Sequence, residues 1–456
     1  MNEEKPIERV IAAPARAIDR TVEASKVVRD SILNQTQVRQ VKHYWEILGP
    51  GLTTGASDDD PSGIATYSQT GAKYGFQFLW LSVFTFPLMA VIQEMCARIG
   101  IKTGRGLADN IRRNFSPSVL YFCTIVLFIA NTFNIGADLG AMAKATQLLY
   151  PQSSFIYLIV GFAVVSIGLQ IYSTYERFAR YLKWLALILL AYVITAFLIS
   201  DINWHDVFRA SVVPSFNFSK DQMLLVCAIL GTTISPYLFF WQTSQEVEET
   251  IGVKQKIVIG SQYLKKAIKN MRVDVWSGMF LSNVVMFFII VTCSATLHKS
   301  GIFEVASAAD AAAALRPLAG DRAYLLFALG IIGTGLLALP VLAGSAAYAV
   351  SESLEWSEGL SKKIKNAYSF YGVMVLAILI GLGLNFIGLD SIKMLIYAAV
   401  LNGLVAPVVL IFIVILSSNQ KVMGEFANSR PLSIIGWTVV GLMGVVALAT
   451  IYSLIF

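Results

Sequence analysis

Three consecutive carboxylates in the middle of an otherwise apolar segment are the feature that most constrains how this chain can fold. Asp58, Asp59 and Asp60 lie in a hydrophobic segment from Trp45 to about Tyr74, which is long enough to cross a bilayer. An aspartate at the bilayer centre costs roughly 3 kcal/mol even on translocon-insertion scales, so such residues normally face a polar interior. The segment therefore predicts a buried cation path in a membrane protein.

The residues that follow the carboxylates predict a break in the helix. Pro61 has no backbone N–H and Gly63 tolerates unusual backbone angles, so carbonyl and amide groups are left free to bind a ligand. A second apolar segment, 223–245, repeats the pattern with Ser235 and Pro236 in its middle. Interrupted segments at corresponding positions are typical of two inverted repeats that meet at a binding site near the membrane midplane.

The composition places the chain among multi-pass membrane proteins. Hydrophobic residues make up 56% and charged residues 14% of the sequence, and the mean hydropathy is +0.65. Apolar runs of about 20 residues predict eleven membrane-spanning segments in an all-α fold. They lie near residues 46–72, 77–101, 118–149, 154–172, 181–200, 223–245, 274–297, 323–350, 367–389, 393–417 and 432–455.

The basic residues indicate orientation and not nucleic-acid binding. The net charge is +6, and Lys and Arg concentrate in alternate loops, as the positive-inside rule requires of cytoplasmic loops. We expect an integral protein of the bacterial inner or plasma membrane, with a cytoplasmic N-terminus and, for eleven spans, an external C-terminus. The four cysteines lack CxxC spacing and are interpreted as buried apolar residues.

The same pattern predicts the domain organisation. Residues 1–45 form a charged cytoplasmic tail, and residues 46–456 form a transmembrane transporter domain. Within that domain, repeat one covers about 46–200, repeat two covers about 223–417, and 432–455 is an extra helix.

Short motifs are spread over the predicted spans. They are Gly49-Pro50-Gly51 and Asp60–Gly63 in the first span, Gln93–Gly100 in the second, Ala137–Leu139 in the third, Ser235–Tyr237 in the sixth, and Met423-Gly424 with Asn428 after the tenth. Together, from Gly49 to Asn428, they resemble the Nramp family of proton-coupled divalent metal transporters. The resemblance implies a LeuT-like fold of eleven helices, with two inverted five-helix repeats and a metal held between broken helices 1 and 6.

The resemblance also implies which residues bind the metal. Asp60 carries over as the metal-binding carboxylate, and the backbone carbonyls near Ala228 and Thr232 are candidate ligands from the sixth helix. Ser235 stands at the position of a family methionine ligand. Asp59 is a candidate for a further carboxylate at the site, because neighbouring side chains point in different directions and only one of the two extra acids is expected to join it.

Four residues are candidates for the ion pathway or for coupling: Asp58, Asp138, Tyr237 and Asn402. Asp138 belongs to the third-helix motif of the family, whereas Tyr237 replaces a family histidine. Asp58 lines the path or pairs with a basic group, and Asn402 lines the path or bridges helices.

Departures from the family pattern shift the expected substrate. Gly63 stands where the family has an asparagine ligand, and Ser235 stands where it has methionine. Oxygen ligands without sulfur suit Mg²⁺, Ca²⁺ or Mn²⁺, and a larger site lets Mg²⁺ keep several waters. Tyr237, Gln242 and Ala141 replace two histidines and a glutamate, which removes groups that titrate near neutral pH.

These observations predict a secondary transporter of a divalent cation, Mg²⁺ or Mn²⁺, that works by alternating access with weak or no proton coupling, similar to the Nramp-related magnesium transporters. Two alternatives stay open. One is a transporter of the same fold that carries an organic or inorganic anion and uses the acidic cluster for Na⁺ or H⁺. The other is a receptor that does not transport.

No enzymatic activity is expected, because neither an HExxH motif nor a Ser/His arrangement is present, and the lack of a GxxxxGK[ST] motif argues against an ATP-driven pump. The expected partners are the transported ion and the lipid bilayer. We expect no separate cofactor and no nucleic acid, and we expect a monomer.

Overall fold

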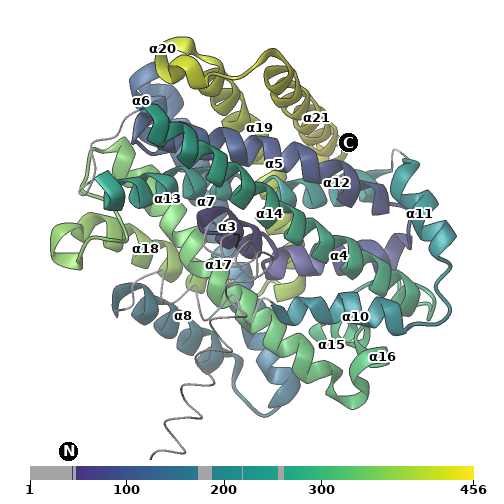
Figure 1. Cartoon of the computed structure of the whole chain (residues 1–456). Coiled ribbons are helices and arrows are strands. Elements are labelled where there is room, and N and C mark those ends of the chain that lie inside the picture. Colours follow the sequence, from purple (N-terminus) through teal and green to yellow (C-terminus); the bar gives the residue numbers. More distant parts are fainter. Residues whose placement is uncertain (1–43, 45–47, 173–186, 218, 255–260, 456) are drawn as a thin grey trace, which may run out of the picture. The chain divides into compact units, whose positions relative to one another are not determined.

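The computed structural model describes residues 44, 48–172, 187–217, 219–254 and 261–455 (Figure 1). The chain divides into two units, Met1–Gly49 and Pro50–Phe456. In the first unit only Tyr44, Leu48 and Gly49 are described, so the predicted tail lies almost wholly outside the described residues. Within these ranges every regular element is helical and none is a strand.

The elements of the second unit form two groups along the chain. The first group contains α3 (Pro50–Asp58), α4 (Pro61–Tyr74), α5 (Leu79–Thr103), α6 (Leu107–Asn114), α7 (Pro117–Leu149), α8 (Phe155–Tyr172), η1 (Leu187–Leu189), α10 (Leu190–Leu198) and α11 (Trp204–Val212). The second contains α12 (Lys220–Thr233), α13 (Pro236–Lys254), α14 (Ser261–Cys293), η2 (Ser294–His298), α15 (Ala308–Ala313), α16 (Arg316–Ala319), η3 (Gly320–Arg322), α17 (Ala323–Ser353), η4 (Ile364–Asn366), α18 (Tyr368–Leu384), α19 (Ser391–Ser418), α20 (Gln420–Met423), η5 (Gly424–Phe426) and α21 (Arg430–Ile455).

Among the described residues, eight helices are long and apolar enough to cross a membrane. They are Leu79–Thr103, Pro117–Leu149, Phe155–Tyr172, Lys220–Thr250, Gln262–His298, Ala323–Ser353, Ser391–Ser418 and Arg430–Ile455. The shorter helix α18 is also apolar, and the first predicted span is divided between α3 and α4. The predicted span 181–200 begins outside the described residues, so the count of eleven stays a prediction.

The first predicted span breaks immediately after the acid triplet. Helix α3 ends at Asp58 and α4 begins at Pro61, which occupies the first helical position. Proline suits that position because its missing N–H would have no helical acceptor there and its φ is already helical. Asp60 is the N-cap residue, and its side chain accepts a hydrogen bond from the Gly63 N–H at 2.8 Å.

The sixth predicted span breaks in the corresponding place. Helix α12 ends at Thr233 and α13 begins at Pro236. The Ser235 hydroxyl donates to the carbonyls of Gly231 at 2.7 Å and Thr232 at 2.8 Å. It thereby satisfies acceptors that the end of a helix leaves open. Both helix breaks lie directly before the prolines that predict them, whereas Gly63, also predicted at the break, lies within the first turn of α4.

Helix packing encloses the first break. Helix α3 packs mainly against α14 and also contacts α13 and α17, whereas α4 packs against α14, α19, α12 and α7. Figure 1 shows α3 in the middle of the view among α7, α13, α14 and α17. The acid triplet therefore lies inside the helical domain and not at its lipid-facing rim.

Glycines allow α3 and α14 to pack backbone to backbone. A methyl group added at Gly55 would overlap the backbone of Gly278, and one added at Gly278 would overlap the backbone of Gly51. Small residues at such contacts let membrane helices approach closely. The contact fixes the height of α14 beside the end of α3, so that Ser282, one turn after Gly278, faces the acid triplet.

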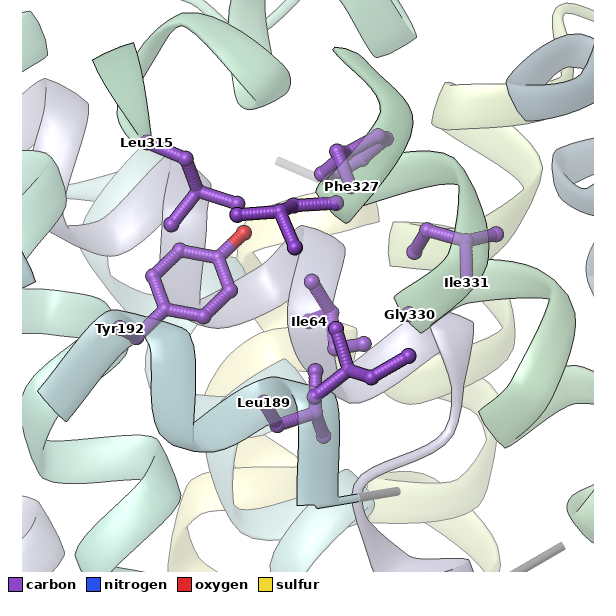
Figure 2. Close-up of a pocket in the computed structure, with 9 residues that line it drawn as sticks. Ile64, Leu189, Tyr192, Leu315, Phe327, Gly330 and Ile331 are labelled. Atoms are coloured by element: carbon purple, nitrogen blue, oxygen red, sulfur yellow. The ribbon is translucent and has the colours of Figure 1, made fainter. Parts of the chain in front are cut away.

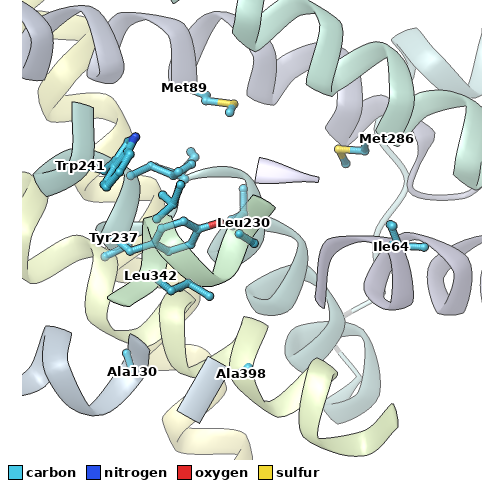
Figure 3. Packing of buried hydrophobic residues seen from close by; sticks show 14 of the residues in the cluster. Ile64, Met89, Ala130, Leu230, Tyr237, Trp241, Met286, Leu342 and Ala398 are labelled. Atoms are coloured by element: carbon cyan, nitrogen blue, oxygen red, sulfur yellow. The ribbon is translucent and has the colours of Figure 1, made fainter. Parts of the chain in front are cut away.

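Apolar side chains fill the space around the breaks. Figure 3 shows Tyr237 and Trp241 of α13 packed among the buried hydrophobic residues, with Leu230 of α12 close by. By contrast, α8 and α21 are apolar but mostly exposed, which is typical of helices that face lipid. The core therefore holds the two broken helices, while these two helices contribute the lipid-facing surface.

Candidate cation site at the helix breaks

Asp60 is held by three hydrogen-bond donors on two helices. Its Oδ1 accepts from the Ser62 hydroxyl at 2.6 Å and from the Gly63 N–H at 2.8 Å, and its Oδ2 accepts from Asn134 Nδ2 of α7 at 2.8 Å. The side chain is 1% exposed. The carboxylate is therefore fixed at the N-terminus of α4, where the helix dipole favours negative charge.

The end of α12 faces this carboxylate region across Gly63. A Cβ atom at Gly63 would lie 3.1 Å from Thr232 Oγ1, so an asparagine at this position would need Thr232 to shift. Ala228 lies one turn earlier, inside α12, where helical hydrogen bonding engages backbone carbonyls. Thr232 in the last turn of α12 and Ser235 in the break after it thus offer oxygens near the site, and Ala228 could offer its carbonyl only if the end of α12 unwound further.

Asp58 and Asp59 contact a different helix from Asp60. The Ser282 hydroxyl of α14 lies 2.7 Å from Asp58 Oδ2 and 3.3 Å from Asp59 Oδ1. Asp58 is 0% exposed and Asp59 is 3% exposed, and Asp58 Oδ1 has no hydrogen-bond partner among the described residues. The triplet therefore divides, with Asp60 bound to α4 and α7 and the other two bound to α14.

A line of polar groups runs along α7 beside the site. Asn134 and Asp138 are four residues apart, so they share a face of the helix. Asn134 Oδ1 and both carboxylate oxygens of Asp138 are buried and without partners in the described part of the chain, as are both side-chain polar atoms of Asn402 on α19. Helices α7 and α19 pack together. Since each such group costs about 1–3 kcal/mol if it stays unsatisfied, these residues suit a hydrated or ion-conducting path.

Tyr237 connects the two breaks. Its hydroxyl donates to the Ser57 carbonyl at 3.1 Å, near the end of α3. A second contact joins the same two helices, because the Thr54 hydroxyl donates to Gln242 Oε1 at 2.6 Å. Tyr237 and Gln242, which stand at the two histidine positions of the family resemblance, therefore connect α13 to α3.

Sequence reasoning missed Ser62 and Ser282 and did not assign Asn134 to the acid. Ser62 could have been found, because a serine two residues after an N-cap aspartate can donate to it. Ser282 carries no such local signal, because it lies 224 residues from Asp58. Asn283, its neighbour, instead bridges α14 to α5, since its Oδ1 accepts from the Thr85 hydroxyl at 3.1 Å.

No cluster of three or more His, Cys, Asp or Glu side chains suited to a metal occurs in the residues that the structure describes. A metal near Asp60 would therefore combine at most two such side chains with hydroxyl and carbonyl oxygens. Such a ligand set carries little negative charge and suits an ion that keeps part of its water shell.

A small apolar pocket lies next to the site (Figure 2). Ile64, one turn after Asp60 in α4, forms part of its wall. The other lining residues are Ile188, Leu189, Tyr192, Leu315, Leu326, Phe327, Gly330 and Ile331. These side chains are almost entirely hydrocarbon, so the pocket is unsuited to coordinating a cation and forms an apolar boundary beside the polar break.

The loop after α17 contains a separate group of carboxylates. Glu248 of α13 accepts hydrogen bonds from the backbone N–H groups of Leu360 at 2.7 Å and Ser361 at 3.0 Å. Burial raises the pKa of Glu358 in this loop to about 6, although the positive charge of Lys362 opposes the shift. This loop is therefore attached to α13 and holds an acid that titrates just below neutral pH.

The fold and the site define a class of protein. An all-helical membrane domain with two discontinuous helices that meet at a buried carboxylate is the architecture of LeuT-like secondary transporters. A manganese transporter from Eremococcus coleocola, solved with an aromatic bis-isothiourea substituted compound, is similar with a TM-score of 0.73 and 18% identity, over 90% of this chain and 87% of that one. A mutant of that transporter gives a TM-score of 0.69 at 18% identity, over 89% and 86%. The inward-facing form of Mhp1 gives 0.51 at 15% identity, over 89% and 90%.

The sequence identifies the family within this class. Residues 51–453 match the profile of the Nramp family, described as natural resistance-associated macrophage protein-like. The chain belongs to the Nramp family. It is an integral, multi-pass membrane transport protein, and the predicted family and fold class are confirmed.

Proposed function

We propose that this Nramp-family protein transports a hard divalent cation, Mg²⁺ or Mn²⁺, by alternating access, with weak or no proton coupling. The observation that carries the proposal is the fixed carboxylate of Asp60, 1% exposed between α4 and α7 at the first helix break. A buried, oriented carboxylate inside a membrane domain is costly and marks an ion or substrate path, which supports its assignment as a cation ligand.

The ligand chemistry supports a hard ion. The two break segments, 57–63 and 231–237, supply carboxylate, hydroxyl and carbonyl oxygens but no sulfur. We assign Asp60, Thr232 and Ser235 as ligands, with Ala228 joining only after further unwinding of α12. Oxygen ligands suit Mg²⁺ and Mn²⁺, and Gly63 leaves room for retained waters.

The contacts of Tyr237 support weak proton coupling. Its hydroxyl is engaged with the Ser57 carbonyl, and a tyrosine does not titrate near neutral pH as histidine does. Asp138 remains as a titratable group on the α7 side of the path. We therefore expect metal entry to proceed without an obligatory proton flux.

One contact argues against the anion alternative. An anion would use the free N–H groups at the start of α4, but the Asp60 side chain already accepts from the Gly63 N–H. The negative charge at this helix end is supplied by the protein itself. A cation that neutralises this charge fits the position better than a second anion.

The basic loops support the proposed orientation, with the N-terminus in the cytoplasm and the C-terminus outside. We also propose that the protein resides in the bacterial inner or plasma membrane and that it is a monomer.

Uptake into liposomes that contain the purified protein tests the proposed function. For each of the two ions, Mg²⁺ and Mn²⁺, we expect the rate of entry with a pH gradient to be similar to the rate without one. We expect Asp60→Ala to abolish the entry of both ions. The matched control is Asp206→Asn, which removes an exposed carboxylate of α11. Proton entry that tracks metal entry would contradict the coupling proposal, and metal entry through Asp60→Ala would contradict the site.

A further inference from the structure

We infer that Asp58 and Asp59, together with Ser282 of α14, form a second divalent cation site, separate from the site at Asp60. The inference rests on the proposed function, because it adds a second ion to the same path. It explains two carboxylates of the triplet that the Asp60 site does not use.

The first observation is the direction of the contacts. Ser282 Oγ lies between Asp58 Oδ2, at 2.7 Å, and Asp59 Oδ1, at 3.3 Å, on the side of the break where α14 lies. The donors to Asp60 come instead from α4 and from Asn134 of α7. Two ions at these two places would be held by different helices.

The second observation is a pair of unpartnered oxygens. Asp58 Oδ1 is buried without a hydrogen-bond partner among the described residues, and so is the hydroxyl of Tyr67, whose side chain is 0% exposed. Tyr67 lies on α4 one turn after Gly63, and its ring edge is 3.4 Å from the position of a Gly63 Cβ. Two buried oxygens close to the break, one from a carboxylate and one from a phenol, are thus left without a hydrogen-bond partner in the described part of the chain.

The third observation is the absence of a balancing charge. Within the described ranges, no Lys, Arg or His forms an ion pair with Asp58 or Asp59. Buried carboxylates are normally paired or bind metal, because an isolated buried charge is costly. Two adjacent carboxylates with hydroxyl oxygens suit a small divalent cation such as Mg²⁺ or Mn²⁺.

The packing of α3 against α14 makes the arrangement rigid enough to bind an ion. Gly51 and Gly55 of α3 and Gly278 of α14 admit no added methyl group without overlap. Ser282 follows Gly278 by one helical turn, so its position relative to Asp58 is set by backbone contact and not by long side chains. Ligands held on rigid elements bind with less loss of conformational entropy.

Equilibrium dialysis of the purified full-length protein against Mn²⁺ tests the inference by counting bound ions per chain. We expect two Mn²⁺ ions for the wild type and one for Asp60→Ala. For Asp58→Asn/Asp59→Asn we also expect one, bound with the affinity of the Asp60 site. Asp206→Asn, which neutralises an exposed acid of α11, is the matched control and should bind two.

A milder variant covers the case in which the double variant does not fold. Ser282→Ala removes one hydroxyl and no charge, and we expect it to weaken only the second ion, by roughly tenfold, the size of a lost hydrogen bond to a charged group. The affinity of the first ion should stay unchanged, which separates a ligand from a merely structural residue.

The outcomes separate this inference from the proposed function. If the wild type binds one Mn²⁺, which Asp60→Ala abolishes and Asp58→Asn/Asp59→Asn leaves in place, the second site is overturned and the proposed function stands. If Asp60→Ala still binds two ions, the Asp60 site of the proposed function is overturned. A tenfold loss in Ser282→Ala at one of two sites supports the second site.

Discussion

The two sides of the first helix break hold their carboxylates in different ways. Asp60 accepts three hydrogen bonds from α4 and α7, so its carboxylate is oriented before any ion arrives. Asp58 accepts one hydrogen bond, from Ser282, and keeps a buried oxygen without a partner in the described residues. The comparison shows that adjacent acids in one sequence motif can have separate roles, because the helices that donate hydrogen bonds to them differ.

The largest expected effect comes from removing the charge of Asp60 while keeping its cap. Asparagine caps helices about as well as aspartate, so Asp60→Asn should change the free energy of unfolding by less than about 0.5 kcal/mol. Metal uptake should fall by at least about a hundredfold, the cost of losing a charged ligand worth roughly 3 kcal/mol. Uptake by proteoliposomes and thermal unfolding in detergent measure the two effects. A large loss of stability would show that the carboxylate is primarily structural.

The next effect concerns the identity of the ion on the Asp60 side. Gly63→Asn combined with Ser235→Met would introduce an amide oxygen and a thioether, and thioethers favour softer transition metals. We expect uptake of Cd²⁺ relative to Mg²⁺ to rise by roughly tenfold, which corresponds to about 1.4 kcal/mol. Competition between the two ions in a liposome assay measures the ratio. Ser235→Ala is the matched control, and an equal shift in it would assign the selectivity to the loss of the hydroxyl.

A smaller effect should appear in stability on the Asp58 side. Asp58→Asn removes an unpaired buried charge but leaves polar atoms behind, so we expect the free energy of unfolding without divalent ions to rise by about 1 kcal/mol. Thermal unfolding in detergent with a chelator measures it. Asp60→Asn should give no such rise. Equal stabilisation by both substitutions would remove the contrast between the two sides.

The smallest effect provides a pH control outside the membrane. Burial raises the pKa of Glu358 to about 6, so the folded protein binds its proton more tightly than the unfolded chain does. Ionisation therefore costs stability as the pH rises from about 4.5 to 6, and the full cost persists above pH 6. We expect Glu358→Gln to be more stable than the wild type at pH 7.5 by under about 1 kcal/mol, after allowance for solvent screening, and equally stable at pH 4.5. Thermal unfolding at both pH values checks the sign.

The same variant also shows where a pH dependence of uptake arises. Any pH dependence of uptake between pH 5 and 7 that disappears in Glu358→Gln belongs to the loop after α17. A dependence that remains belongs to the membrane domain, with Asp138 as the first candidate.

The sequence allowed the helix breaks and the family to be predicted because their signals are local. Pro61 and Pro236 restrict the backbone wherever they occur, and the short motifs around Asp60 and Asp138 can be read without knowledge of contacts. The division of the acid triplet could not be predicted in this way. It depends on the contact of Gly278 with Gly55, which are more than two hundred residues apart and which place Ser282 against Asp58.

The hydroxyl of Tyr237 also has a role that residue type alone does not reveal. Its replacement of a family histidine indicates only what is lost for proton chemistry. The structure adds that it donates to the end of α3. Whether a side chain bridges two helices depends on their separation, and no periodicity in the sequence reports that distance.

The two connections between α3 and α13 have a consequence for how the protein moves. Tyr237 with Ser57 and Thr54 with Gln242 join one half of the first broken helix to one half of the sixth through neutral groups. Any movement of α3 relative to the rest of the protein must therefore either carry α13 with it or break these two hydrogen bonds. Because none of these four groups gains or loses a proton near neutral pH, we expect the two hydrogen bonds to persist in acidic as well as in neutral solution. If the protein carries a cation as proposed, acidity would then act on its movement through other groups, with Asp138 as the first candidate.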